Sequence, residues 1–224
     1  MDRAGHITPD QVGFLFDLDG VLVDTARFHF AAWRTLAQSL GSDFTEAQNE
    51  QLKGVSRRKS LEKILAWGNI QLGEEEIQKC MLLKNEWYLE SVRTLTPIDI
   101  LPGSREFLEK ARSMGIGIAL GSASKNAVLI LEQLKIDHLL DTVVDGNQVE
   151  QSKPHPEVFL KGARALGKEP KNCVVFEDAV AGIQAAKAGG MRSVGIGTEQ
   201  NLGDADLVRA SLADIEVEEA LNIL

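Results

Sequence analysis

The stretch FDLDGVLVDT, residues 16–25, decides how the rest of the chain is interpreted. Its first residue, Phe16, is the last of an apolar run, residues 12–16. This run has the composition of a short strand buried in a parallel sheet. Asp17 and Asp19 follow two residues apart, so their side chains share one face of an extended chain. Gly20 then signals a turn. Because open parallel sheets bind ligands beyond the carboxyl ends of their strands, we expect both carboxylates to lie at a functional site.

Two carboxylates this close repel each other, so either one stays protonated or a cation lies between them. A solvated Asp-Gly turn would explain the pair equally well if it stood alone. The pattern D-x-D-G-V-x-x-D-T resembles motif I of the haloacid dehalogenase-like (HAD) phosphotransferases. That resemblance implies that Asp17 is the nucleophile and Asp19 the general acid and base.

Ser122 follows the apolar run 116–120, which we expect to be a strand. Its hydroxyl and the neighbouring N–H groups could hold a phosphate at the start of the next helix. A plain helix N-cap explains this segment equally well. The position of Ser122 resembles motif II of the same family, which implies a contact with the transferring phosphoryl group.

Lys153 lies in the segment SKPHP, residues 152–156. A single lysine before a helix is usually a solvated surface residue. The K-P-x-P context resembles motif III, which implies that Lys153 balances charge between the nucleophile and the phosphate. The same resemblance implies a cis peptide bond between Lys153 and Pro154, although most X-Pro bonds are trans.

Glu177 and Asp178 follow another apolar run, residues 173–176, and precede a predicted helix. Acidic residues there are favourable for the helix dipole alone, so a capping role stays open. Together with Asp17 and Asp19 they would form a site of hard oxygen ligands, which suits Mg²⁺. The pair resembles motif IV. This implies that Asp17, the backbone carbonyl of Asp19, and Asp178 bind the metal, while Glu177 binds either directly or through water.

Residues 26–93 show helical periodicity and no convincing strand. Thr45 and Ser56 are candidate N-caps within this region, and glycines end two of the expected helices. We therefore expect four antiparallel helices in a small bundle.

From residue 103 onward, apolar runs alternate with helical segments, which is typical of a parallel sheet with helices on both faces. Beyond the first strand, we expect strands at 116–120, 142–144, 173–176, 193–196 and near 207, and a last helix from about Asp214.

The predicted fold class is therefore α/β, with a Rossmann-like doubly wound parallel sheet as the core and an inserted helical-bundle cap. We assign residues 1–24 and 95–224 to the catalytic core and residues 25–94 to the cap.

The 224 residues carry a net charge of −9, which argues against nucleic acid or an anionic membrane as a partner. The two cysteines, Cys80 and Cys173, have no paired spacing, and we expect buried, reduced thiols. Residues 1–6 lack the apolar segment of a secretory signal, and no apolar run approaches the roughly 20 residues that span a bilayer. We expect a cytoplasmic monomer that acts on a small molecule.

Three stretches resemble the β-phosphoglucomutase family: FHFAAW (28–33), QLKGVSR (51–57) and SASKN (122–126). The resemblance covers most of the chain. It implies an enzyme that interconverts β-glucose 1-phosphate and glucose 6-phosphate through β-glucose 1,6-bisphosphate, with the sugar turning over between two transfers at Asp17.

A mutase must hold a second phosphate at the far end of the sugar. Arg57 offers a planar fork of donors for it, and residues 124–126 offer more. His29 and Trp33 are four residues apart and share a helix face, where the resemblance places His29 near the hydroxyl that accepts the phosphoryl group. The resemblance implies these substrate-binding residues: Thr25, His29, Trp33, Lys53, Gly54, Val55, Ser56, Arg57, Ser60, Lys84, Ser122, Ala123, Ser124, Lys125, Asn126 and Lys153.

Simpler explanations stay open for single residues, such as a packed histidine for His29, cap core for Trp33 and a solvated basic stretch for residues 57–59. Two positions depart from the family pattern: Gly121 replaces an expected alanine, and His155 replaces a small residue. The main alternative function is a sugar-phosphate phosphatase on the same fold. A metal-independent dehalogenase fits the four acidic residues less well, and a non-catalytic binding module fits poorly with intact acid and lysine positions.

Overall fold

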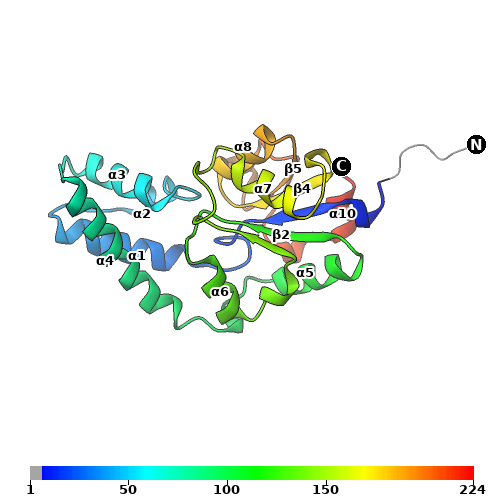
Figure 1. Cartoon of the computed structure of the whole chain (residues 1–224), viewed down its shortest axis with the longest axis horizontal. Coiled ribbons are helices and arrows are strands. Elements are labelled where there is room, and N and C mark those ends of the chain that lie inside the picture. The colour runs from blue at the N-terminus through cyan, green and yellow to red at the C-terminus, as the bar shows by residue number, and fades with distance from the viewer. Residues whose placement is uncertain (1–6) are drawn as a thin grey trace, which may run out of the picture.

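The computed structural model describes residues 7–224 (Figure 1), so the first six residues, where we expect no signal segment, lie outside the described part. One parallel sheet has the strand order β3-β2-β1-β4-β5-β6. Its strands are β1 Gly13–Phe16, β2 Gly117–Gly121, β3 Thr142–Val144, β4 Cys173–Glu177, β5 Arg192–Ile196 and β6 Leu207–Arg209. The strand order reverses between β1 and β4, which makes this edge the expected ligand site of a doubly wound fold. The predicted α/β class is confirmed.

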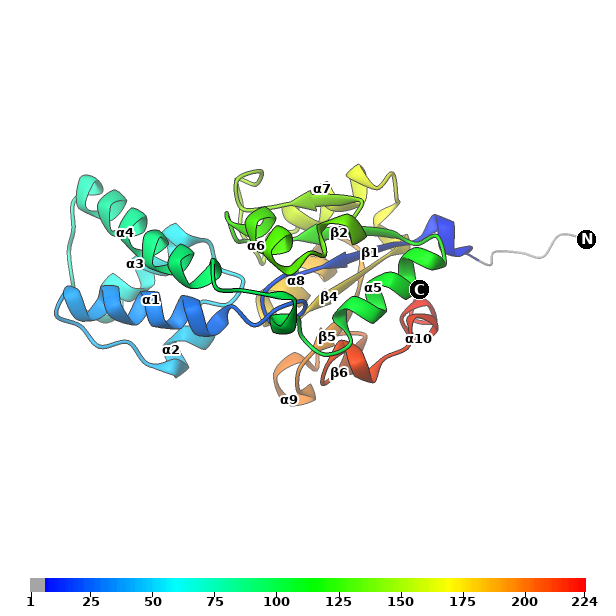
Figure 2. The ribbon, with the colours of Figure 1, turned by 90° about the horizontal axis from the view of Figure 1, so that it is seen from below.

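Helices cover both faces of the sheet, as the two views show (Figures 1 and 2). The core helices are α5 Ser104–Ser113, α6 Ala127–Leu134, α7 Glu157–Ala165, α8 Val180–Ala188, α9 Glu199–Leu202 and α10 Val217–Leu221. Phe14 and Phe16 of β1 pack toward α5, α6 and α10, whereas Leu15 packs toward α7 and α8. This alternation follows from the two-residue period of a strand, and it buries both faces of β1.

Four helices project from one end of the sheet, on the left of Figures 1 and 2. They are α1 Ala26–Ser39, α2 Glu46–Glu50, α3 Arg57–Trp67 and α4 Glu74–Val92. They enclose a hydrophobic cluster of their own, built around Trp33, Leu36 and Leu61. Thr45 caps α2 by accepting a hydrogen bond from the Gln48 N–H at 3.3 Å. Ser56 occupies the N-cap position of α3, but its side chain makes no capping hydrogen bond.

Short 3-10 helices connect several elements: η1 Pro9–Gln11, η2 Pro97–Asp99, η3 Asp137–Leu139, η4 Pro170–Asn172 and η5 Leu212–Asp214. The last of these corrects the expectation that the final helix begins near Asp214. The hydroxyl of Ser211 accepts the Ala213 N–H and caps the start of η5, and Ile215 after η5 is extended and buried. The final helix, α10, begins only at Val217. The short helix α9 was not predicted.

A Cβ atom at Gly121 would lie 2.8 Å from the Phe159 ring, which explains why this position lacks the expected alanine. Both cysteines are free thiols, as expected, but Cys80 is only partly buried whereas Cys173 is fully buried. Within residues 7–224, no helix combines the length and the apolar character needed to cross a bilayer.

Candidate active site

The strand ends bring four of the predicted residues to one edge of the sheet. Phe16 of β1 pairs in register with Phe176 of β4 and with Leu120 of β2. The residues that follow these three positions therefore lie side by side at the carboxyl edge of the sheet. Asp17 follows β1, Ser122 follows β2, and Glu177 and Asp178 lie at the end of β4. The Asp17 N–H donates to the Phe176 carbonyl at 2.9 Å, which extends the β1–β4 pairing into the site.

Lys153 joins two of these acids. Its Nζ donates to Asp17 Oδ1 and to Glu177 Oε1, both at 2.7 Å, and its side chain is 1% exposed. The other oxygen of Glu177 accepts the Ala179 N–H at 2.9 Å. The peptide bond between Lys153 and Pro154 is cis, as the resemblance implied. Gly182 leaves space for Glu177, since a Cβ atom there would lie 1.8 Å from Glu177 Oε1. The pair of Lys153 and Glu177 is therefore tightly built into the core.

Asp17, Glu177 and Asp178 offer carboxylate oxygens that lie within 4.8 Å of one another, a spacing suited to a metal ion. Asp19 Oδ1 is buried and has no hydrogen-bond partner among the described residues. The close approach of this segment to β4 requires Gly20, because its φ is +82° and a Cβ atom would lie 2.2 Å from Asp178 Oδ2.

The charges at this edge also fit a divalent cation. Lys53 of the cap lies 3.2 Å from Asp178 Oδ2, so Lys53 and Lys153 form ion pairs with three of the four acids, Asp17, Glu177 and Asp178. If all are ionised, negative charge stays in excess even when Lys84 near Asp19 is counted, and a divalent ion would offset it. Oxygen ligands without His or Cys suit Mg²⁺.

The carboxylate pKa values express the same crowding. Burial raises the pKa of Glu177 to about 8. The charge of Lys153 lowers this pKa and the charge of Asp17 raises it, but burial is the largest effect. Burial and the charge of Asp17 raise the pKa of Asp178 to about 6. Burial and the charges of Asp17 and Asp178 hold the pKa of Asp19 well above its usual range. Without a cation, the folded protein therefore holds protons on acids that would be ionised in the unfolded chain.

The raised pKa values of these acids predict how the stabilisation by Mg²⁺ depends on pH. Glu177 and Asp178 ionise near 4.5 and 3.8 in ordinary surroundings, so the metal-free folded state binds extra protons up to about pH 8. Stability of the metal-free protein falls over that window, because the folded state binds more protons than the unfolded state. Mg²⁺ competes with those protons, so its stabilising effect should grow from pH 5 to pH 8.

The measurement is urea unfolding at each pH in Mg²⁺ and in EDTA. The free energy of unfolding in Mg²⁺ minus that in EDTA, taken at each pH, reports the titration of the acids at the metal site. The titration of cap groups such as His29 is common to both conditions and cancels. A Mg²⁺ effect that is constant or shrinks toward pH 8 would contradict the prediction.

The cap contributes a second cluster beside Asp19. Lys84 Nζ lies 2.7 Å from His29 Nδ1, and its ammonium lies over the rings of Trp33 and Tyr88, 4.7 and 4.6 Å from their centroids. Burial lowers the pKa of Lys84 and of His29. A neutral His29 would accept from Lys84 through Nδ1, which leaves Nε2 as the ring donor. Sequence reasoning missed Tyr88, although it lies four residues after Lys84 on α4.

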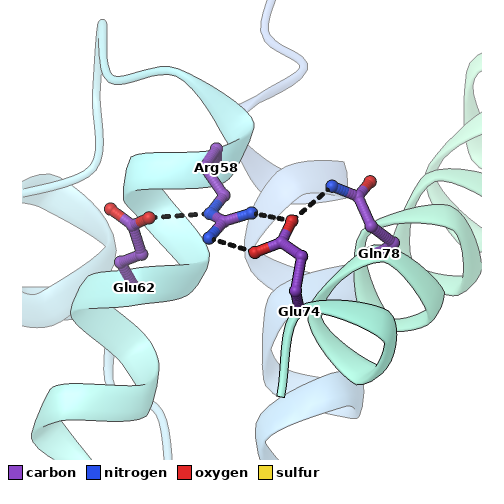
Figure 3. Close-up of polar contacts among 4 residues, drawn as sticks. All are labelled: Arg58, Glu62, Glu74 and Gln78. Carbon is purple, nitrogen blue, oxygen red and sulfur yellow. Dashed lines mark hydrogen bonds and ion pairs between the residues drawn. The ribbon is translucent and has the colours of Figure 1, made fainter. Parts of the chain in front are cut away.

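Arg57 and Arg58 are neighbours with different surroundings. Arg57 Nη2 donates to Asn85 Oδ1 at 2.8 Å and lines the cavity. Arg58 instead makes two hydrogen bonds to Glu74, at 2.6 and 2.8 Å, and one to Glu62 at 2.7 Å (Figure 3). The solvated basic stretch considered for residues 57–59 therefore describes the exposed Lys59 and the partly exposed, ion-paired Arg58, but not Arg57. Sequence reasoning also missed Asn85, since nothing in its spacing marks it.

One cavity between cap and core collects most of the predicted residues. Its lining includes these predicted residues: Asp17, Asp19, His29, Trp33, Lys53, Gly54, Val55, Arg57, Ser60, Lys84, Ser122, Ala123, Ser124, Lys125, Asn126 and Asp178. Ala26, Asn49 and Leu52 also line it without having been predicted.

Four predicted residues do not line this cavity. Ser56 and Lys153 line a smaller adjoining one that shares Arg57 and Ser122. Thr25 and Glu177 are fully buried. Thr25 Oγ1 has no hydrogen-bond partner among the described residues.

Comparisons with known proteins agree with this geometry. Residues 12–190 match the family model described as haloacid dehalogenase-like hydrolase. The chain is 41% identical to a β-phosphoglucomutase of Bacillus subtilis, covering 91% of each protein. It is 33% identical to a phosphorylated carbohydrates phosphatase of Thermotoga maritima, covering 94% of this chain and 96% of that protein. A crystal structure of β-phosphoglucomutase from Clostridium difficile superimposes with a TM-score of 0.91 at 43% identity, covering 94% of this chain and 96% of the other.

Proposed function

The chain belongs to the haloacid dehalogenase-like hydrolase family, and on this premise we propose that it is a β-phosphoglucomutase. It interconverts β-D-glucose 1-phosphate and glucose 6-phosphate through a phosphoaspartate and β-glucose 1,6-bisphosphate. The observation that carries the proposal is Arg57, which faces the same cavity as Asp17 and has an amide, not a carboxylate, as its hydrogen-bond partner. A substrate with phosphates at both ends would place one phosphate at Asp17 and the other at Arg57.

The proposed chemistry starts at Asp17, whose carboxylate attacks the phosphorus while the bond to the sugar oxygen breaks. Asp19 gives a proton to that oxygen and later takes one from the attacking hydroxyl. Its Oδ1 suits this role because no group of residues 7–224 forms a hydrogen bond with it. Lys153 offsets negative charge beside Asp17. Ser122 Oγ accepts the Ser124 N–H at 3.1 Å, so its own proton is free for a phosphoryl oxygen.

Mg²⁺ would be held by Asp17, Asp178 and the Asp19 carbonyl, and when bound it would offset charge on the phosphoryl oxygens. We favour an indirect role for Glu177, because Lys153 and the Ala179 N–H already engage its two oxygens. We also propose residues 25–94 as the cap and residues 1–24 and 95–224 as the core. The separate hydrophobic cluster inside the four helices supports this division.

Arg57 and the donors of residues 124–126, which line the same cavity as Asp17, would hold the second phosphate. His29 and Lys84 would face the sugar hydroxyls, and Trp33 would pack beside them. The cap would also exclude water, which protects the phosphoaspartate from hydrolysis. Lys53 supports this role, because it already connects the cap to Asp178 of the core.

The test is to supply β-glucose 1-phosphate with Mg²⁺ and a trace of the bisphosphate, and to measure glucose 6-phosphate and free phosphate together. We expect glucose 6-phosphate to dominate. Arg57→Ala should lower kcat/KM for this conversion by about 100-fold, because a hydrogen bond to a charged group contributes roughly 1.5–3 kcal/mol. Hydrolysis of p-nitrophenyl phosphate, which has no second phosphate, should change less than about threefold by the same argument.

Arg58→Ala is the matched control and should leave both reactions unchanged, since Arg58 pairs with Glu74 outside the cavity (Figure 3). Free phosphate as the main product would instead identify a sugar-phosphate phosphatase. Equal losses of both activities in Arg57→Ala would argue against a second phosphate site.

A further inference from the structure

Asn85 lies where two cap helices meet the core. It is a partly buried residue of α4, and its Oδ1 accepts Arg57 Nη2 at 2.8 Å and Asn126 Nδ2 at 2.9 Å. Arg57 begins α3 of the cap, whereas Asn126 precedes α6 of the core. An amide oxygen has two lone pairs, so these two donors use its full capacity. One atom therefore joins α3, α4 and the core.

The neutrality of this acceptor matters for Arg57. Of the described residues, none offers a carboxylate within 4 Å of its guanidinium. Arg58 shows the opposite arrangement, because Glu74 accepts two of its N–H groups and Gln78 supports Glu74 at 2.8 Å (Figure 3). The amide of Asn85 fixes the direction of Arg57 while leaving its positive charge available to an anion.

We propose that Asn85 is a positioning residue for the distal phosphate, which holds Arg57 and Asn126 as a ready pair of donors. The inference rests on the proposed function, because the distal phosphate is the ligand that this pair would bind. Ordering a long side chain before binding lowers the entropy lost when the ligand arrives. Because the bond between Asn85 and Asn126 crosses from cap to core, the pair forms only while the two are in contact.

The experiment is a calorimetric titration of β-glucose 1,6-bisphosphate, with Mg²⁺, into protein carrying Asp17→Asn so that no turnover occurs. Asn85→Ala should weaken binding about tenfold, the loss expected for one hydrogen bond at a charged group. In a background that also carries Arg57→Ala, the same change should weaken binding less than about twofold, because residues that act through one another are not additive. Gln78→Ala is the matched control on the exposed side of α4 and should bind like the parent.

Asn85→Asp separates positioning from a structural role. The carboxylate keeps the shape and the contact but neutralises Arg57 and repels the phosphate, so this variant should bind more weakly than Asn85→Ala. A structural contact would give the reverse order. The inference is overturned by that reverse order, by an Asn85→Ala variant that binds like the parent, or by losses from Asn85→Ala and Arg57→Ala that simply add. A failure of the proposed function would be seen in a different assay, in which the unaltered enzyme would release free phosphate from β-glucose 1-phosphate. The titration measures binding at the distal site whether the enzyme is a mutase or a phosphatase.

Discussion

Replacing Asp17 with asparagine should abolish turnover, by on the order of 10⁴-fold or more, as removal of a nucleophile does in other enzymes with covalent intermediates. The amide has the size of the carboxylate but cannot accept the phosphoryl group. Isomerisation of β-glucose 1-phosphate and hydrolysis of p-nitrophenyl phosphate should both be lost, because both need the same nucleophile. Substantial activity in either assay would contradict a phosphoaspartate mechanism.

The same substitution should leave the fold intact. The asparagine oxygen can still accept the hydrogen bond that Lys153 Nζ gives to Asp17 Oδ1. The lost charge is also one that raises the pKa values of Asp19, Glu177 and Asp178, so crowding among the acids decreases. The free energy of unfolding without metal should therefore change by no more than about 1 kcal/mol, the net value of an ordinary hydrogen bond. A larger loss would mean that inactivity reflects misfolding.

The acidic end of the site could be predicted from the sequence because strand register determines it. Asp17 and Glu177 each follow apolar runs, and parallel pairing of Phe16 with Phe176 places both at one level. The position of Lys153 near Asp17 rested on family resemblance instead, and its contact with Glu177 was not foreseen. Its position in a loop 136 residues after Asp17 gives no geometric signal, and the structure places its Nζ 2.7 Å from Asp17 Oδ1.

The cap end was less predictable, because its contacts depend on how two separately packed groups of helices meet. Asn85 bonds to residues 28 and 41 positions away, and no periodicity links them. Lys53 was predicted to bind substrate, but its contact with Asp178 across the cap and core was not foreseen. Tyr88 is different, because it follows Lys84 by one helical turn and helical spacing would have suggested it.

Replacing Lys153 with methionine should destabilise the metal-free protein by roughly 3 kcal/mol or more at pH 8, because breaking a buried ion pair leaves uncompensated charge. Methionine keeps much of the lysine's length and can pack on the Phe159 ring, over which the ammonium now lies at 4.7 Å from the centroid. The cost therefore comes from charge. Glu177 is 0% exposed and Asp17 is 5% exposed, and neither would have a cationic partner in place of Nζ. Turnover should fall as well, because no ammonium would offset charge beside the nucleophile.

Two comparisons separate charge from shape. The deficit should shrink as the pH falls from 9 to 6. Lys153 lowers the pKa of Glu177, so the methionine variant keeps a proton on Glu177 that the parent loses above about pH 8, and this difference disappears at lower pH. Adding Glu177→Gln to the methionine variant should restore most of the stability at pH 8 but not the activity, since Asp17 would still lack its ammonium. Lys161→Met removes an exposed partner of Glu157 and should cost less than about 1 kcal/mol, as surface ion pairs do. Unfolding curves in urea would decide, and a deficit that is equal at pH 6 and pH 9, or unrelieved by Glu177→Gln, would show that Lys153 matters for packing rather than for charge.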